Sequence, residues 1–450
     1  MRGRATVAVG MTILLAVAAP AAGGPPGQWT RLPGTVVNFA QPGLARTSDG
    51  ALHVVFTRKN GTKSEIAHAT VSAAGAVGSI TVALGNWSSM SHPDLVLLPD
   101  GSLRVFFGGI RSTSPGETNN ALNTATAPAS GASWTLQPGK AAQATYAYAT
   151  TYAGADVAKS GTPISTWAGS PGLGFHYGVD PKDADGKIPQ SGCCLYHPDI
   201  GVDSASGAAW IGFSSNESAS PGLFVNAIEP SGQKGGRKLA PGSVTGKSFR
   251  LEQSRTPITG RIGAAGVYLA YTQGYPTAKT LALWRVDTAK PQIVIRADRA
   301  EHAVAAAAPE GRLWLVWERS GTIYATRTNK AATKPGAVTT LGAPVSKSIY
   351  ELDGEGSGGP LDLFVNDGQA LWHQQVLPKL SLSGKRAGKT IVFTVTDAGD
   401  PVVGAKVKAG GKTLTSAANG RAVLAKAPTG RVKASATKAG YAASAPATVR

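Results

Sequence analysis

One short pattern of apolar and polar positions returns seven times along the chain. A glycine opens it, apolar residues follow at alternate positions, and an aromatic side chain closes it about six residues later. The copies begin at Gly50, Gly101, Gly161, Gly207, Gly266, Gly311 and Gly358. Alternation with a period of two is typical of β-strands, and glycine allows the tight turn before each strand. The pattern therefore predicts seven similar strand units.

Each copy is followed by a polar turn and a second apolar run, which predicts a hairpin. The clearest turn is Asn366-Asp367-Gly368, a typical connection between antiparallel strands. The opening glycines lie 45 to 60 residues apart, enough for four short strands, and such a repeat indicates a β-propeller. We therefore predict an all-β protein with a seven-bladed β-propeller over residues 29–377, six blades being the alternative. A strand within residues 29–39 is expected to complete the last blade and close the ring.

The pattern is different at the amino terminus. Residues 1–4 contain two arginines and residues 5–19 are mostly apolar, which is the layout of a secretory signal peptide. We expect this peptide to cover residues 1–21 and a Gly/Pro linker to cover residues 22–28. No later run approaches the length of about 18 apolar residues that a transmembrane helix needs. The protein is therefore expected to be exported and extracellular, without a transmembrane segment.

A second β domain is expected at the carboxyl terminus. Short alternating runs separated by glycine turns between residues 378 and 450 predict a small β-sandwich. The segments Val395–Val407 and Asn419–Ala422 resemble bacterial Ig-like and carboxypeptidase-regulatory-like domains. The resemblance implies an accessory or adhesive module rather than a catalytic one.

Positive charge is concentrated in this second domain. The chain has a net charge of +18, and residues 378–450 contain 13 Lys and Arg against 2 Asp and Glu, a net +11. In an exported protein this favours an anionic partner, namely a wall polymer, lipid headgroups or acidic glycans, and association with the cell wall through this domain. Nucleic acid is not expected. The alternative interpretation is a lysine-rich, solvated β surface with no partner.

The two cysteines are adjacent, Cys193 and Cys194. Because exported proteins meet oxidising conditions, we expect a disulfide between these neighbours. Two free thiols or a bridge to another chain are the alternatives.

Three histidines recur before the strand pattern. His92, His197 and His302 lie 105 residues apart and nine or ten residues before their glycines, so the ring should bring them to one rim. Two of them begin the string His-Pro-Asp, which adds Asp94 and Asp199. Neutral imidazoles could bind a ligand or act as a base, whereas inheritance from the repeat would leave them structural. We expect no cofactor; a metal held by the three histidines, with Gln41 or a carboxylate as a fourth ligand, is an alternative.

Aromatic and charged residues complete the predicted rim. Tyrosines can stack on sugar rings, although alternating tyrosines are also typical of a buried strand. The ligand-binding candidates are Tyr146, Tyr148, Tyr196, Asp94, Asp199, Arg299 and Glu301. If the protein is an enzyme, the catalytic candidates are His92, His197, His302, Tyr152 and Arg255.

One segment resembles the Asp-box of the bacterial neuraminidase repeats in the sialidase superfamily. In Ala127–Trp134 the glycine and the tryptophan of that motif are kept, Ser133 replaces threonine, and Ala127 and Ala129 replace serine and aspartate. The resemblance implies a propeller and a glycosidase, but sialidases have six blades and a Phe-Arg-Ile-Pro segment that is missing here. The His, Tyr and Arg residues of the rim also resemble the set used by seven-bladed polysaccharide lyases.

Three functions follow from these observations. The first is a secreted propeller that binds an extracellular glycan or cell-wall polymer at its His/Tyr/Arg-rich rim. The second is a sialidase-like glycoside hydrolase or a polysaccharide lyase acting on an acidic polysaccharide. The third is a non-catalytic scaffold for protein interactions. The sequence does not decide whether the protein is an enzyme.

Overall fold

A computed structural model describes residues 26–37, 40–111, 121–137, 153–168, 175–179, 182–188, 195–215, 221–229, 232–243, 255–274, 277–344 and 349–450. Within these ranges the regular structure consists of β-strands and one short 3₁₀ turn, η1 (Pro309–Gly311). None of the described segments forms a helix with the length and apolar character needed to cross a membrane.

The described strands up to Val376 form seven antiparallel sheets. The first contains β2 (Gly43–Arg46), β3 (Leu52–Asn60), β4 (Lys63–Val71) and β5 (Thr81–Trp87). The second contains β6 (Ser89–Met90), β7 (Asp94–Leu97), β8 (Leu103–Ile110), β9 (Ala121–Ala127) and β10 (Thr135–Leu136). The third contains β11 (Ala153–Val157), β12 (Pro163–Ala168), β13 (Phe175–Val179) and β14 (Lys182–Ile188).

The other four sheets repeat this order. The fourth contains β15 (Leu195–Val202), β16 (Ala209–Ser215), β17 (Gly222–Glu229) and β18 (Gly232–Leu239). The fifth contains β19 (Ile258–Gly260), β20 (Val267–Gln273), β21 (Thr280–Arg285) and β22 (Ile293–Arg296), and the sixth β23 (Ala303–Ala307), β24 (Leu313–Arg319), β25 (Thr322–Arg327) and β26 (Thr339–Leu341). The seventh contains β27 (Glu351–Glu355), β28 (Leu361–Asn366), β29 (Leu371–Val376) and β1 (Thr30–Arg31).

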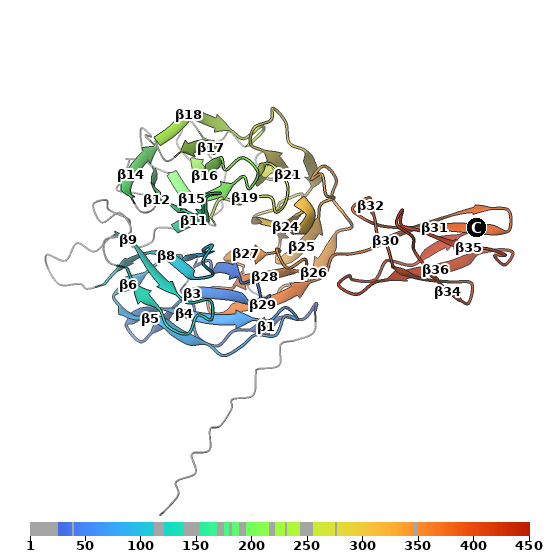
Figure 1. Ribbon diagram of the computed structural model, residues 1–450, viewed down its shortest axis with the longest axis horizontal. Helices are drawn as coiled ribbons and strands as arrows, with labels where there is room; N and C mark the ends of the chain where they lie inside the picture. Colours follow the sequence, from blue (N-terminus) through green and yellow to red (C-terminus); the bar gives the residue numbers. More distant parts are fainter. Residues whose placement is uncertain are drawn as a thin grey trace, which may run out of the picture.

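The sheets are arranged as the blades of a β-propeller, which confirms the all-β propeller part of the predicted fold class (Figure 1). We call the strand that precedes the hairpin of each sheet its opening strand. Contacts join the opening strands of successive sheets in the order β7, β11, β15, β19, β23 and β27. The opening strand of the first sheet, β2, contacts both β7 and β27. The ring therefore closes on itself, and these opening strands line its axis.

The amino-terminal strand joins the last sheet, but it is shorter than the expected 29–39. β1 pairs with β29 in the register Thr30↔His373, whereas Val36 forms a bridge to Arg58 of the first sheet. Pro33 offers no N–H to a sheet and Gly34 has a φ of 104°, so the chain turns away from the last sheet there.

The opening glycines perform the predicted turn, with one correction. Gly50, Gly101 and Gly311 have φ values of 87°, 83° and 74°, but in the seventh copy the left-handed residue is Gly359, at 103°, and not Gly358. This moves the frame of the last copy by one residue, because β28 begins two residues after Gly359, as β3 does after Gly50.

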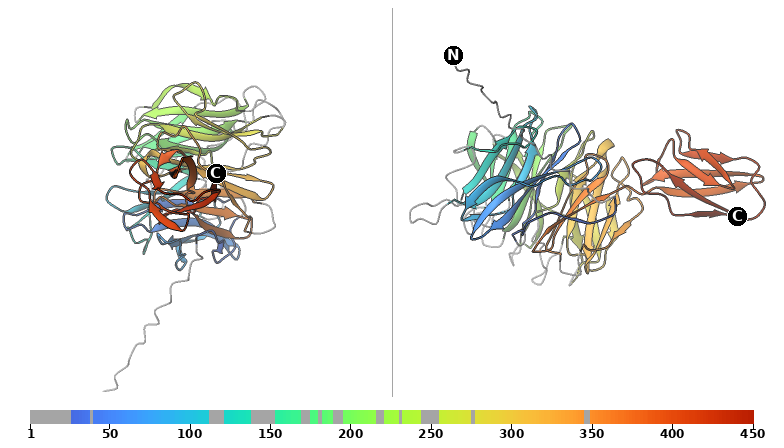
Figure 2. Two further views of the ribbon diagram at one scale, coloured as in Figure 1. Left: turned by 90° about the vertical axis from the view of Figure 1, so that its right-hand side faces the viewer. Right: turned by 90° about the horizontal axis from the view of Figure 1, so that it is seen from below.

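The carboxyl-terminal residues form two further four-stranded sheets. One contains β30 (Ser381–Ala387), β31 (Thr390–Asp397), β32 (Asp400–Pro401) and β35 (Arg421–Leu424). The other contains β33 (Lys406–Ala409), β34 (Lys412–Thr415), β36 (Val432–Thr437) and β37 (Ala447–Val449). Apolar side chains of both sheets share one core. The domain projects from the edge of the ring as a separate lobe (Figure 2).

Candidate functional site

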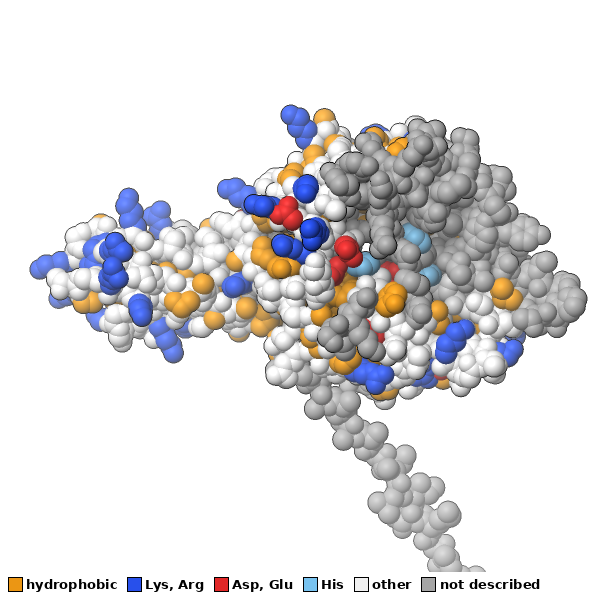
Figure 3. Space-filling model, turned by 180° about the vertical axis from the view of Figure 1, so that it is seen from behind, with side chains coloured by type: hydrophobic (Ala, Val, Ile, Leu, Met, Phe, Trp, Pro, Cys, Tyr) orange, Lys and Arg blue, Asp and Glu red, His pale blue; other side chains and the backbone are white. Residues whose placement is uncertain are grey.

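Polar side chains from several sheets meet where the opening strands begin. We call the following residues the axial cluster: Gln41, His92, Asp94, His197, Asp199, Arg255 and Asp353. They precede or open β2, β7, β15, β19 and β27, so they come from five of the seven sheets. Figure 3 shows histidine and acidic side chains gathered around a hollow in the middle of one face, which we call the axial hollow.

Arg255 holds the axial cluster together. Its guanidinium is only 6% exposed, and it forms ion pairs of 2.6 Å with both Asp94 and Asp353. It also donates a hydrogen bond of 2.6 Å to the carbonyl oxygen of Pro42. Burial alone would lower the pKa of Arg255, but the neighbouring aspartates raise it above its ordinary value. Arg255 is therefore a permanent buried cation with its charge already compensated.

Gln41 links four sheets through three hydrogen bonds. Its Nε2 donates to the carbonyl oxygen of Leu352 at 2.7 Å, and its Oε1 accepts from the backbone N–H of Arg255 at 2.6 Å. Its own backbone N–H donates to Nδ1 of His92 at 3.3 Å. Gln41 thus acts as a cross-link between opening strands, and these contacts keep its side chain from serving as a metal ligand.

His92 and His197 are both neutral at pH 7. Burial, followed by the charges of His197 and Arg255, holds the pKa of His92 well below its ordinary value. Burial also lowers the pKa of His197 to about 3. Because Nδ1 of His92 accepts a hydrogen bond from Gln41, the proton of that ring is on Nε2.

His197 lies in a β-bulge with a left-handed backbone conformation. His197 has a φ of 56°, and the pairing of β15 with β16 is irregular between Tyr196 and Asp199. A bulge of this kind turns a side chain away from the regular pleat. The carbonyl oxygen of His197 accepts hydrogen bonds from the N–H and Oγ1 of Thr256 at 2.9 and 2.8 Å, which fixes the bulge against the fifth sheet.

Burial changes the proton affinity of two aspartates of the cluster. It raises the pKa of Asp353 to about 6, and together with the charge of Asp94 it raises the pKa of Asp199 well above its usual range. Asp94 accepts backbone hydrogen bonds from Leu95 and from Ala155 of the third sheet at 2.9 and 2.7 Å. The cluster therefore carries less negative charge than its three carboxyl groups suggest.

Two further aspartates near the axis, Asp156 and Asp353, were not among the candidate site residues. Asp353 compensates Arg255. Asp156 accepts hydrogen bonds from Val157 and from Val202 of the fourth sheet at 2.7 and 2.9 Å, and burial raises its pKa to about 7. The available signal was an acid inside a short opening strand, since neither residue follows the His-Pro string that singles out Asp94 and Asp199.

His302 has other partners. It is half-buried at the start of the sixth sheet, and burial lowers its pKa to about 4, against the effect of a backbone hydrogen bond with Ile349. Its carbonyl oxygen accepts from the N–H of Glu318 at 3.2 Å. The neighbouring candidates Arg299 and Glu301 are exposed. Contacts thus unite His92 and His197 with Arg255, and place His302 with Glu318 and Ile349.

No metal site is found among the residues that the structure describes. Within them, no group of three or more His, Cys, Asp or Glu is arranged to hold a metal ion. Of the described histidine side chains, only His197 and His302 are not buried. Among the described histidines, these two residues are therefore the ones that are partly exposed.

Several predicted residues fall outside the described part of the chain. These are Tyr146, Tyr148, Tyr152, Cys193 and Cys194. Tyr196 is described only by its backbone, as part of β15. Stacking of tyrosines on a sugar and the disulfide between the cysteines remain predictions.

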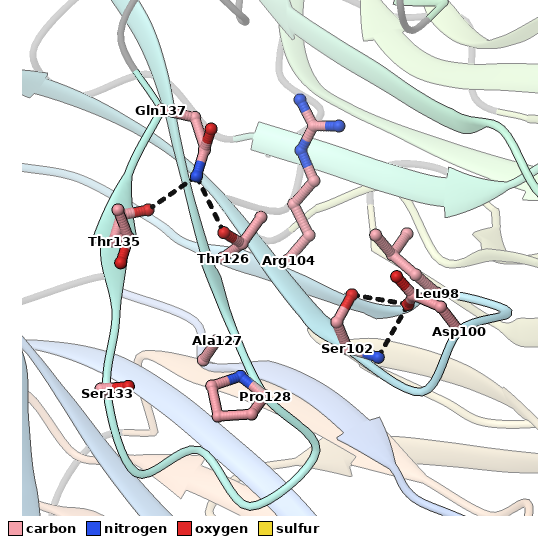
Figure 4. A pocket seen from close by; sticks show the side chains of 10 residues that line it. All are labelled: Leu98, Asp100, Ser102, Arg104, Thr126, Ala127, Pro128, Ser133, Thr135 and Gln137. Carbon is pink, nitrogen blue, oxygen red and sulfur yellow. Dashed lines mark hydrogen bonds between the residues drawn. The ribbon is translucent and has the colours of Figure 1, made fainter.

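A second hollow lies on the second sheet, away from the axial cluster. It has a volume of about 460 Å³ and is lined by Leu98, Asp100, Ser102, Arg104, Thr126, Ala127, Pro128, Ser133, Thr135 and Gln137. Figure 4 shows that many of its polar groups bond to one another: Asp100 accepts from the N–H and hydroxyl of Ser102 at 2.9 and 2.6 Å, and Gln137 donates to Thr126 at 3.0 Å. The Asp-box-like segment forms part of its wall, between β9 and β10.

No family model and no curated protein matches the chain. Among solved structures it is similar to a polysaccharide lyase (9% identity, 78% of this chain and 99% of that chain covered, TM-score 0.44). It is also similar to the WD40 domain of Toxoplasma gondii coronin (11%, 80% and 90%, 0.45) and to a Hadza microbial sialidase (8%, 75% and 65%, 0.38). Likeness at these identities and TM-scores says nothing about what this chain binds.

Proposed function

We propose that this is an exported protein that binds an extracellular glycan in the axial hollow. The observation that carries the proposal is His197, a partly exposed residue of the axial cluster whose imidazole burial keeps neutral at pH 7. A neutral imidazole can both donate and accept a hydrogen bond, which is what a sugar hydroxyl requires. The bonds of Arg255 and Gln41 fix the cluster to which His197 belongs, so little order has to be gained on binding.

The charge of the axial cluster favours a neutral glycan. Among its seven residues only Arg255 is a permanent cation, and Asp94 and Asp353 compensate it. A uronate or sialate carboxylate would have to compete with these two aspartates for the guanidinium. The described residues thus support hydroxyl recognition better than they support a lyase or a sialidase acting on an acidic polysaccharide.

The finer points of the fold belong to the same proposal. We infer seven blades, because seven sheets with contacting opening strands are described and β1 completes the last. The carboxyl-terminal domain is proposed to be an Ig-like sandwich, because its two sheets share one core. Its net charge of +11 supports association with an anionic wall after export through residues 1–21.

A glycan array tests the site. The purified chain should bind neutral oligosaccharides more tightly than sialylated or uronate-containing ones. His197→Ala should weaken this binding at least about tenfold, the effect of one or two lost hydrogen bonds. Ser102→Ala with Gln137→Ala, in the second hollow, is the matched control and should leave binding unchanged. Loss with the control pair alone would move the ligand to the second hollow, and unchanged binding in all variants would favour a scaffold.

Hydrolysis of a neutral glycan is the second candidate function. Burial and the charge of Asp94 raise the pKa of Asp199 well above its usual range, which suits a carboxylic acid that donates a proton near neutral pH. Release of reducing ends from a bound oligosaccharide, abolished in Asp199→Asn, would establish this activity. Binding without release would leave the protein a glycan-binding propeller.

A further inference from the structure

Both acidic residues of the carboxyl-terminal domain face the propeller. Asp397 forms ion pairs with Arg327 and, at 3.4 Å, with Arg312. Asp400 pairs with Arg312 at 2.7 Å and accepts a hydrogen bond of 2.7 Å from the backbone N–H of Lys330. Arg327 belongs to β25 of the sixth sheet, and Arg312 and Lys330 lie in turns between strands of that sheet. The two carboxylates are therefore used to dock the domain on the ring.

The rest of the domain surface is left without an acidic side chain. Residues 378–450, all of which the structure describes, contain 13 Lys and Arg, and their only acids are the two docked aspartates. Figure 3 shows blue side chains and no red ones on the face of this domain that is turned to the viewer. An anionic partner would therefore be attracted by the basic side chains of this surface and repelled by no acidic side chain of the domain other than the two docked aspartates.

One sheet concentrates this charge on a regular surface. Lys406, Lys408 and Lys433 are exposed on the outer face of the sheet β34-β33-β36-β37, while Val407 and Val432 point into the core. The other outward positions are hydroxyl residues: Thr413, Thr415, Ser435, Thr437 and Thr448. We call this surface the lysine face.

The three lysines form a row. Lys406 and Lys408 are two residues apart on β33, and Lys408 is paired with Ser435, two residues from Lys433 on β36. Successive outward residues of a strand are about 6.6 Å apart, so the backbone positions of Lys406 and Lys408 have this spacing, and Lys433 lies one such step further along on the neighbouring strand. Lys406 donates a hydrogen bond of 2.9 Å to Thr415 on the adjacent strand, which keeps its charge on this face.

We propose that the lysine face binds a linear anionic polymer, with successive negative groups placed on the row of lysines. The proposal deepens the inferred wall association and is independent of glycan binding in the axial hollow. A polymer is favoured over a lipid surface because the outward residues are lysines and hydroxyls, with none of the large apolar side chains that enter a membrane interface. Because Asp397 and Asp400 are paired with arginines of the propeller, no acidic side chain of the domain competes with the partner for the lysines.

Inorganic polyphosphate tests this proposal, because it has regular negative charges and no sugar. The triple variant Lys406→Glu, Lys408→Glu and Lys433→Glu should lose at least about tenfold in affinity, and the salt dependence of its binding should fall by about two to three counterions. The matched control is Lys385→Glu, Lys389→Glu and Arg421→Glu, which makes the same charge change on exposed positions in and beside the other sheet. The control should retain most of the affinity, and both triples should keep the thermal midpoint of the parent chain.

Three outcomes would overturn the proposal. Equal losses in the two triples would show that net charge matters and the lysine face does not. Unchanged binding in the first triple would remove the face from the interaction. Binding to phosphatidylglycerol vesicles but not to polyphosphate would make the partner a membrane. His197→Ala should leave polyphosphate binding intact, so failure of the axial site and failure of the lysine face are distinguishable.

Discussion

Asp94 and Arg255 belong to the second and fifth sheets, and their side chains form an ion pair of 2.6 Å at the axis of the ring. The same guanidinium reaches Asp353 of the seventh sheet and the carbonyl oxygen of Pro42 beside the first. One buried side chain thus connects sheets that are not neighbours. The axial cluster is therefore part of what holds the ring closed as well as part of the candidate site.

Removal of Arg255 should destabilise the protein strongly. Arg255→Met leaves Asp94 and Asp353 near the axis without their cation, and breaking a buried pair in this way costs about 3–5 kcal/mol. Urea denaturation followed by tryptophan fluorescence would measure the free energy of unfolding. Arg299→Met, at an exposed position, should change it by less than about 0.5 kcal/mol. Similar values for both variants would contradict the structural role of Arg255.

His197 should make the protein less stable in acid. Its pKa is about 3 in the folded protein against an ordinary value of 6.5, so the unfolded chain binds the proton more tightly. The stability it contributes is complete above pH 6.5 and is lost as the pH falls toward 3, by up to about 1.4 kcal/mol per pH unit. His197→Gln should therefore show a shallower loss of unfolding free energy between pH 6 and pH 4. Parallel pH profiles would refute the prediction.

Any side chain at Gly154 should lower the free energy of unfolding. A Cβ at this position would lie 2.7 Å from both Cα and Oδ1 of Asp199 and 3.0 Å from the carbonyl oxygen of Pro198, so the third and fourth sheets would have to separate. Gly154→Ala is expected to cost about 1–3 kcal/mol. Gly342→Ala, with no heavy atom within 4 Å of its Cβ, should be neutral or stabilising by up to about 1 kcal/mol. Thermal unfolding of the two variants compares them.

Asp397 should control how firmly the carboxyl-terminal domain is docked. Asp397→Asn keeps the shape but removes the negative charge between Arg312 and Arg327, so two buried guanidinium groups lose part of their compensation. Faster proteolysis near residues 377–380 and a broader distance distribution in small-angle scattering are expected. Asp287→Asn, in an exposed pair with Arg285, is the control and should change neither measurement. An unchanged proteolysis rate for Asp397→Asn would argue against the dock.

Most of the strands were readable from the sequence because their cause is local. Alternation places Val105 and Phe107 on one buried face of β8, and only glycine readily takes the φ of 83° at Gly101. The sequence pattern starts the last copy one residue too early, because the adjacent glycines Gly358 and Gly359 both fit it. Which of them turns is decided by the pairing of β28 with β27 and β29.

By itself, the sequence determined the all-β propeller class of the fold and the excess of positive charge near the carboxyl end, and it singled out His92, His197 and Arg255 as candidate site residues. Only the tertiary structure decided which partners these residues have. Gln41 and Arg255 are 214 residues apart yet share a hydrogen bond, and Asp397 meets Arg327 from another domain. Such contacts depend on ring closure and domain docking. Periodicity reports which face of a strand is buried, whereas the partner of a buried charge is set by how the sheets come together.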